Sequence, residues 1–185
     1  MKAVTATDIC EYPTAMKPSK AIEAQFEGLL EQHSGIVRKV AFGYARNESD
    51  RRDLMQDIVL QLWKAYPRYS PDRPFSTWMY RIALNVAISF LRRNSRPGRE
   101  TVPYDESQHD VVHPHSSSPE TDGRIAMLQE VIIKCPPLDR ALLLLYLEDR
   151  SYREIATVLG LSETNVATKL SRLKERLRQE LTTNP

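Results

Sequence analysis

The chain has 185 residues, which is room for one ordinary domain or two small ones. Its 26 basic and 24 acidic residues leave a formal net charge of only +2, and 41% of its residues are apolar. No stretch approaches the roughly 18 apolar residues of a membrane span, and Cys10 and Cys135 match no metal or redox spacing. These features argue against a membrane protein and a disulfide scaffold, and we expect a cytoplasmic chain with reduced thiols.

Residues 1–20 have no helical periodicity and are expected to form a disordered tail. Apolar residues at helical spacing predict a helix over 21–45 and a second over 50–66. Prolines 67, 71 and 74 interrupt this pattern. A third helix, capped by Ser76 or Thr77, is predicted to continue to about residue 93. We assign residues 21–93 to a first small helical domain.

The charge pattern changes sharply after this domain. Residues 73–99 contain six arginines and no acid, whereas residues 100–124 contain six acids and one arginine. Prolines, serines and three histidines, without a helical stripe, predict a flexible acidic linker over 94–123. A flexible polar linker explains the histidines better than a metal site, which would need further ligands.

Residues 124–185 carry the pattern of a helix-turn-helix. Ser151 and Glu154 have the spacing of a capping box at the start of a short helix. Gly160 is placed to end that helix in a left-handed conformation, and Ser162 can cap the next one. Strand signals are weak throughout, so we predict an all-α chain of two small helical domains.

The last helix has one apolar and one polar, basic face. Concentrated positive charge indicates a surface that meets phosphates, and amide and guanidinium groups can read base edges in the major groove. The alternative is an ordinary solvated helix face, but the glycine turn and the two caps favour DNA binding. The polar face comprises Asn165, Thr168, Lys169, Arg172 and Arg176.

Two further faces in the first domain each have two interpretations. Trp78, Arg81, Asn85 and Arg92 recur on one face of the third helix, where an aromatic ring beside arginines suits strand-separated DNA. Trp78 is equally consistent with a core position. On the second helix Asp50, Asp53 and Asp57 share a face. Acids near a helix N-terminus are stabilised by the macrodipole, but the same face could dock a basic protein.

These residues resemble a bacterial RNA polymerase sigma factor of the extracytoplasmic-function (ECF) type of the sigma-70 family. Residues 50–93, from DRRDLMQDIV to SFLRR, resemble the second region of that family, and residues 133–177, from IKCPPLDRAL to LKERL, resemble its fourth region. The resemblance implies that 21–93 binds core polymerase and the minus-ten element, and that 124–185 reads the minus-thirty-five element.

The resemblance also implies roles for individual residues. The clamp helices of the largest polymerase subunit would contact Asp50, Asp53, Leu54, Gln56 and Asp57. The minus-ten element, with one base flipped out of the non-template strand, would contact Phe75, Trp78, Arg81, Asn85, Arg92 and Arg93. The minus-thirty-five element would contact Asn165, Thr168, Lys169, Ser171, Arg172 and Arg176. The acidic linker would occupy the RNA exit channel.

One departure from the family pattern concerns the docking face. Members commonly carry an acid where this chain has Arg52, so its docking patch is less acidic. Phosphorylation of nearby Ser49 by an activating kinase would restore negative charge. An anti-sigma factor is a further partner that the resemblance suggests.

The leading interpretation is therefore a promoter-specificity subunit without catalysis, metal or cofactor. The alternative is a self-sufficient helix-turn-helix regulator that binds duplex DNA without polymerase. An enzyme is disfavoured because the sequence has no glycine-rich phosphate loop, no metal cluster and no nucleophile beside a base.

Overall fold

The computed structural model describes residues 20–94 and 130–183. The predicted tail (1–20) and linker (94–123) lie outside these residues except at one terminal position each. All regular elements of the described residues are helical, which confirms the all-α prediction. Among these helices, none has the length and apolar content that crossing a membrane requires.

The first predicted helix is two helices, so the prediction of one helix over 21–45 is wrong. α1 (Lys20–Gln32) and α2 (Ser34–Tyr44) meet at His33, whose backbone angles of φ −111° and ψ 13° are not helical. His33, Ser34 and Gly35 are all weak helix formers, which makes this the natural point for a break. The break lets both Phe26 of α1 and Val37 of α2 reach the core.

α3 (Glu48–Ala65) begins after Asn47, whose side chain accepts a hydrogen bond from the Asp50 amide at 2.7 Å. A short 3₁₀ helix, η1 (Tyr66–Arg68), and a loop then lead to α4 (Phe75–Asn94). The predicted cap of α4 is wrong, because Thr77 already lies in its first turn. The Thr77 and Trp78 amides donate instead to the Pro74 carbonyl, at 3.1 and 3.2 Å.

The second half of the chain contains α6 (Pro137–Leu147), α7 (Tyr152–Leu159) and α8 (Glu163–Thr183), preceded by helical residues 130–134. The capping box of Ser151 and Glu154 is present, and Gly160 adopts a left-handed φ of 68°. The Ser162 hydroxyl accepts from the Asn165 amide at 3.2 Å, as predicted. These short-range signals place α7 and α8 as a helix-turn-helix.

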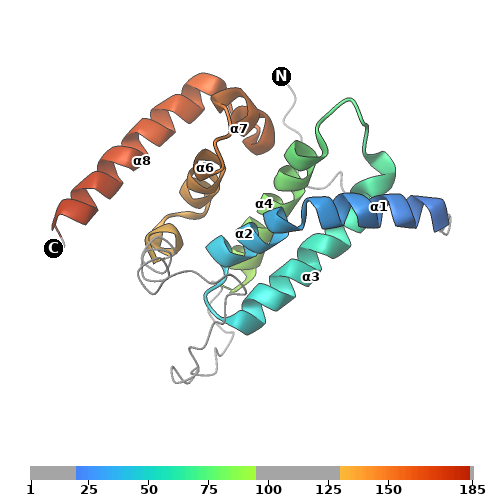
Figure 1. Cartoon of the computed structure of the whole chain (residues 1–185). Coiled ribbons are helices and arrows are strands. Elements are labelled where there is room, and N and C mark those ends of the chain that lie inside the picture. Colours follow the sequence, from blue (N-terminus) through green and yellow to red (C-terminus); the bar gives the residue numbers. More distant parts are fainter. Residues whose placement is uncertain (1–19, 95–129, 184–185) are drawn as a thin grey trace.

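The two halves pack against each other (Figure 1), with α2 and α4 of the first half in contact with α6 and α7 of the second. Fully buried side chains of both halves, including Leu54, Met79, Leu142 and Leu170, belong to one continuous hydrophobic cluster. α8 lies on the outside of this body and runs away from it toward the C-terminus. The arrangement leaves α3 and α8 at opposite sides of the molecule.

Candidate nucleic-acid interface

The polar face of α8 is open to solvent. Val166, Leu170 and Leu173 turn into the core, which sets the opposite face outward. Asn165 and Arg172 are exposed, and Arg172 forms no ion pair within the described part of the chain. This face therefore offers an amide and an uncommitted guanidinium. Of the other predicted residues, Thr168 and Ser171 are exposed and Lys169 is half-buried.

Arg176 differs from the rest of that predicted set. Its guanidinium forms an ion pair of 2.9 Å with Asp139 in the first turn of α6, and the Asp139 side chain is 22% exposed. The hydrogen bond to Asp139 raises the pKa of Arg176 above its ordinary value. A side chain held in this way ties α8 to α6, so a DNA contact from Arg176 would require this pair to break.

On α4, the face opposite the buried Met79 and Ala83 is also open. Arg81 and Asn85 are exposed and lie one turn apart, and Arg92 is exposed two turns further on. The helix thus presents an amide between basic side chains. Such a row suits a nucleic-acid backbone with one base held at the amide.

An aromatic cluster supports the loop that precedes α4. The rings of Phe75 and Trp78 lie 5.2 Å apart, and each lies within 5.3 Å of the Tyr69 ring, measured between centroids. The Tyr69 hydroxyl donates to the Arg73 carbonyl at 2.9 Å, which fixes the loop. The cluster makes a firm wall beside the exposed face of α4.

Two residues predicted to contact the minus-ten element are therefore structural in this conformation. Phe75 is only 6% exposed, which suits a support for the loop, and its contact with DNA stays a prediction. Trp78 is half-buried and its ring packs on Tyr69, which favours the core interpretation left open by the sequence. Both side chains pack within the aromatic cluster that supports the loop before α4.

The acidic face of α3 combines capping with exposure. Asp50 pairs with the side-chain amide of its N-cap Asn47 at 3.0 Å, whereas Asp53 and Gln56 are exposed. Leu54 is completely buried, because it lies one residue, or about 100°, around the helix from Asp53. The prediction that Leu54 lies on the docking surface is wrong.

The N-terminal turn of α3 holds the residues of the predicted regulatory site. Arg52 forms an i,i+4 ion pair with Glu48 at 2.8 Å, and both side chains are exposed. Ser49 is exposed in the same turn. The local charge that Arg52 adds is thus partly balanced by Glu48.

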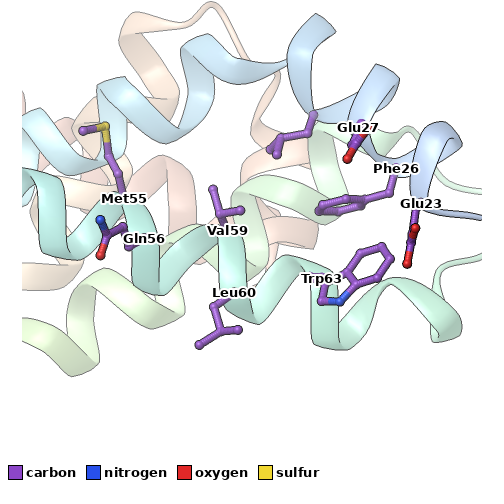
Figure 2. A pocket seen from close by; sticks show the side chains of 9 residues that line it. Glu23, Phe26, Glu27, Met55, Gln56, Val59, Leu60 and Trp63 are labelled. Carbon is purple, nitrogen blue, oxygen red and sulfur yellow. The ribbon is translucent and has the colours of Figure 1, made fainter. Parts of the chain in front are cut away.

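Sequence reasoning missed an apolar groove of about 650 Å³ between α1 and α3 (Figure 2). Phe26 and Leu30 of α1 and Val59, Leu60 and Trp63 of α3 form its apolar lining. Glu23 and Glu27 stand on the α1 side, and Gln56 links the groove to the acidic face of α3. The residue that could have indicated this groove is Leu60, an apolar residue on the outer side of α3 that remains 47% exposed.

The described residues contain no group of three or more His, Cys, Asp or Glu side chains that could hold a metal ion. The predicted linker histidines lie outside the described residues. The exposed faces offer amides, guanidinium groups and carboxylates, which bind nucleic acid and protein partners.

Two family models match the chain in order along its length. Sigma-70 region 2 matches residues 29–97, and Sigma-70, region 4 matches residues 125–177. Together they span both described halves.

Curated relatives agree with these matches. The ECF RNA polymerase sigma factor SigE of Mycolicibacterium smegmatis is 29% identical over 164 residues, which cover 88% of this chain and 63% of that protein. The RNA polymerase sigma factor SigV of Bacillus subtilis is 24% identical over 168 residues, which cover 90% and 97% of the two chains. This chain thus spans less than two thirds of the first relative and nearly all of the second.

Two solved structures share the fold. CnrH, solved in complex with the cytosolic domain of CnrY, aligns with a TM-score of 0.65 and 22% identity, covering 88% of this chain and 91% of CnrH. The sigma factor RpoE from Bartonella quintana, solved with the anti-sigma factor NepR, aligns with a TM-score of 0.66 and 19% identity, covering 87% and 99%. At these identities the likeness concerns the fold.

Proposed function

We propose a division of tasks between the two halves of this chain, which belongs to the ECF type of the sigma-70 family, whose members direct promoter-specific initiation by RNA polymerase. The first half would engage core polymerase and the minus-ten element, and the second half would read the minus-thirty-five element. The single observation that carries this division is the pair of exposed, basic helix faces, one on α4 and one on α8, in two separate family regions.

The minus-ten element would be bound on α4. Asn85 would hydrogen-bond the flipped base, and Arg81 and Arg92 would hold the neighbouring backbone. The aromatic wall of Tyr69, Phe75 and Trp78 supports this assignment, because a rigid loop before α4 can enclose a base without moving. Arg93 would join this set once it leaves its ion pair with Asp57.

The minus-thirty-five element would be read by α8 in the major groove. Asn165 and Arg172 are suited to base edges, and Thr168, Lys169 and Ser171 to the backbone around them. Arg176 would contribute mainly to the packing of α8 on α6, because of its ion pair with Asp139.

The clamp helices of the largest polymerase subunit would dock on α3. Asp50, Asp53, Gln56 and Asp57 form a polar surface, and the groove beside Gln56 adds apolar area. A surface with an apolar centre and a polar rim is the usual anatomy of a protein interface. An anti-sigma factor, of the kind bound to the RpoE structure, would compete for such surfaces. Because core polymerase and chromosomal DNA are its targets, we place the chain in the cytoplasm.

Run-off transcription with purified core polymerase and a genomic fragment library tests this function. Discrete start sites that require the chain are expected, and their alignment would give both promoter elements. If no start sites appear while the chain alone shifts duplex DNA, the self-sufficient regulator is the correct function.

A further inference from the structure

We propose that Thr168, at the centre of the exposed face of α8, recognises the methyl group of a thymine, so that the minus-thirty-five element carries a T·A base pair at the position that Thr168 faces. The inference rests on the proposed function, because it requires α8 to enter the major groove. It deepens that function by naming one base of the element and the chemical group of that base that the chain contacts.

Thr168 lies on the side of α8 that is opposite the core. Val166, Leu170 and Leu173 are buried, and they lie within about 40° of one another around the helix. Thr168 follows Val166 by two residues and therefore lies about 200° around the helix from it. Since α8 is on the outside of the molecule (Figure 1), Thr168 is the exposed residue that points most directly away from the body of the chain.

Longer side chains flank this central position. Asn165 lies one turn before Thr168 and Arg172 one turn after it, both are exposed, and both are rotated toward the same side of the helix. In the major groove the outermost line of a recognition helix comes closest to the base edges, whereas phosphates line the rims of the groove. A short side chain on the central line lets the helix approach closely, so Thr168 is placed to touch a base edge.

The hydroxyl of Thr168 is already engaged within the helix. It donates a hydrogen bond of 2.9 Å to the carbonyl of Thr164, one turn earlier. A threonine hydroxyl has a single proton, so this bond leaves no proton for a phosphate oxygen or for an acceptor on a base. A threonine with a free hydroxyl suits the DNA backbone, whereas Thr168 presents its methyl group.

The methyl group is also held in place before DNA binds. Threonine is branched at Cβ, which restricts the side chain to two common rotamers in a helix, and the bond to the i−4 carbonyl selects between them. The Thr168 side chain therefore loses little conformational freedom when it contacts a base. A fixed apolar group at the centre of the face favours a base that offers an apolar partner.

Thymine is the base that offers this partner. In the major groove its C5 methyl group stands beside the O4 acceptor, and contact with a threonine methyl group is one of the recurrent ways in which thymine is recognised. Two methyl groups in contact remove apolar surface from water. At the same position, an adenine or cytosine amino group that faced the methyl group of Thr168 would lose its hydrogen bond to water without gaining another.

Replacement of thymine by uracil tests this contact, because the two bases pair alike and differ by the C5 methyl group. The probe is a promoter fragment found by run-off transcription, prepared as duplexes in which each thymine of the upstream element, on either strand, is replaced singly. Holoenzyme reconstituted with the full chain should bind one of these duplexes about fourfold more weakly than the unmodified fragment, which is the effect of one buried methyl group. Equal binding of all duplexes in anisotropy titrations, or an element without thymine on either strand, overturns the inference.

Thr168→Ser assigns the effect to this residue, because it removes the methyl group and keeps the hydroxyl. The variant should bind the unmodified fragment about fourfold more weakly than wild type and should no longer distinguish it from the uracil duplex. Thr157→Ser is the matched control, since Thr157 is exposed on α7 and its hydroxyl donates to the Arg153 carbonyl at 2.9 Å. The control should retain the preference of the wild type. A preference for thymine that survives in Thr168→Ser overturns the role of Thr168.

Thr168→Val separates the methyl group from the hydroxyl oxygen, which can still accept a hydrogen bond from an amino group of adenine or cytosine. Valine keeps a methyl group and has nearly the same shape, so this variant should still bind the thymine duplex more tightly than the uracil duplex. Weak binding by Thr168→Val together with normal binding by Thr168→Ser would show that the hydroxyl oxygen makes the contact, and would overturn recognition through the methyl group.

The same experiments distinguish failure of this inference from failure of the proposed function. If run-off transcription gives no start sites that require the chain, the proposed function fails and the inference fails with it. If start sites require the chain but no uracil substitution in the upstream element weakens binding, the proposed function stands and recognition of thymine by Thr168 alone is overturned.

Discussion

The carboxylate of Asp57 on α3 forms an ion pair of 2.9 Å with the guanidinium of Arg93 on α4. Asp57 is proposed to contact polymerase, and Arg93 is proposed to contact promoter DNA. In the free chain, their ion pair therefore neutralises one charge on each of the two functional surfaces. Docking that engages Asp57 would release Arg93 toward the DNA backbone.

This ion pair predicts small effects of opposite sign on DNA binding and on core binding. Asp57→Asn should free Arg93 and strengthen binding of a minus-ten oligonucleotide to the free chain, while weakening core binding. Both side chains are about half exposed, at 56% and 44%, so the effect is expected to be about 1 kcal/mol or less. Fluorescence anisotropy with Asp57→Asn, Arg93→Ala and the double variant measures it. Independent, additive effects would show that the pair couples nothing.

Asn85→Ala should reduce open-complex formation and leave closed-promoter binding nearly unchanged, because the flipped base exists only after melting. Permanganate footprinting and a filter-binding assay separate the two steps. Gln25→Ala, which removes an exposed amide from α1, is the control and should change neither. Equal loss of both steps would exclude the flipped-base role of Asn85.

Arg172 and Arg176 should respond differently to the same substitution. Arg172→Ala is expected to weaken minus-thirty-five binding by about 1–3 kcal/mol and to relax specificity at one base pair. Arg176→Ala should chiefly lower the thermal stability of the second half, since it removes the ion pair with Asp139. Duplex-binding titrations over single-base variants, beside thermal melts, distinguish them. A uniform loss across all sequences for Arg172→Ala would indicate a phosphate contact.

On α3, neighbouring substitutions separate docking from folding. Leu54→Ala should destabilise the chain by about 2–5 kcal/mol, because it leaves a cavity in a fully buried site. Asp53→Ala should weaken core binding and leave the melting temperature unchanged, since this side chain is exposed.

Ser49→Asp should strengthen core binding relative to Ser49→Ala. Equal core affinity of the wild type and Ser49→Asp would exclude regulation by charge at that position.

The capping box of α7 predicts a dependence on pH. Hydrogen bonds from the Ser151 hydroxyl and amide hold the pKa of Glu154 below its ordinary value of 4.5. Because the folded-state pKa is the lower one, the stabilisation is complete above pH 4.5 and is lost as the pH falls through the folded-state pKa. Ser151→Ala should return the pKa toward 4.5 in a carboxyl NMR titration. An unchanged pKa in that variant would mean that the cap does not lower it.

The sequence alone predicted the parts of this molecule that depend on near neighbours. The Ser151 cap and the Gly160 turn involve residues within one helical turn, so their spacing determined them. The helix faces of α4 and α8 followed from periodicity in the same way. Periodicity also predicts that Leu54 is buried, and its placement on the docking surface, which came from the family resemblance, is the part that the structure contradicts.

The contact between the halves could not be predicted from periodicity. The Arg140 guanidinium donates a hydrogen bond of 3.4 Å to the Gly43 carbonyl, 97 residues away, and this contact depends on how two helix pairs meet in space. A hint was nevertheless present, since Arg140 is a charged residue followed directly by a continuous apolar run. The groove between α1 and α3 escaped notice because the helix break at His33, which sets the path of α1, was not predicted.

The contact between α2 and α6 also makes an evolutionary prediction, at Gly43. A Cβ atom there would lie 2.8 Å from a methyl carbon of Leu144 and 3.5 Å from Ile132 of the other half. A small side chain needs only a shift of the flexible end of Leu144, whereas a larger one is limited by a surface that is distant in sequence. Relatives that carry a larger residue at the position of Gly43 should compensate with a smaller one opposite it. The two positions would then covary as partners, and that record would identify the lineages in which the two helical halves pack against each other.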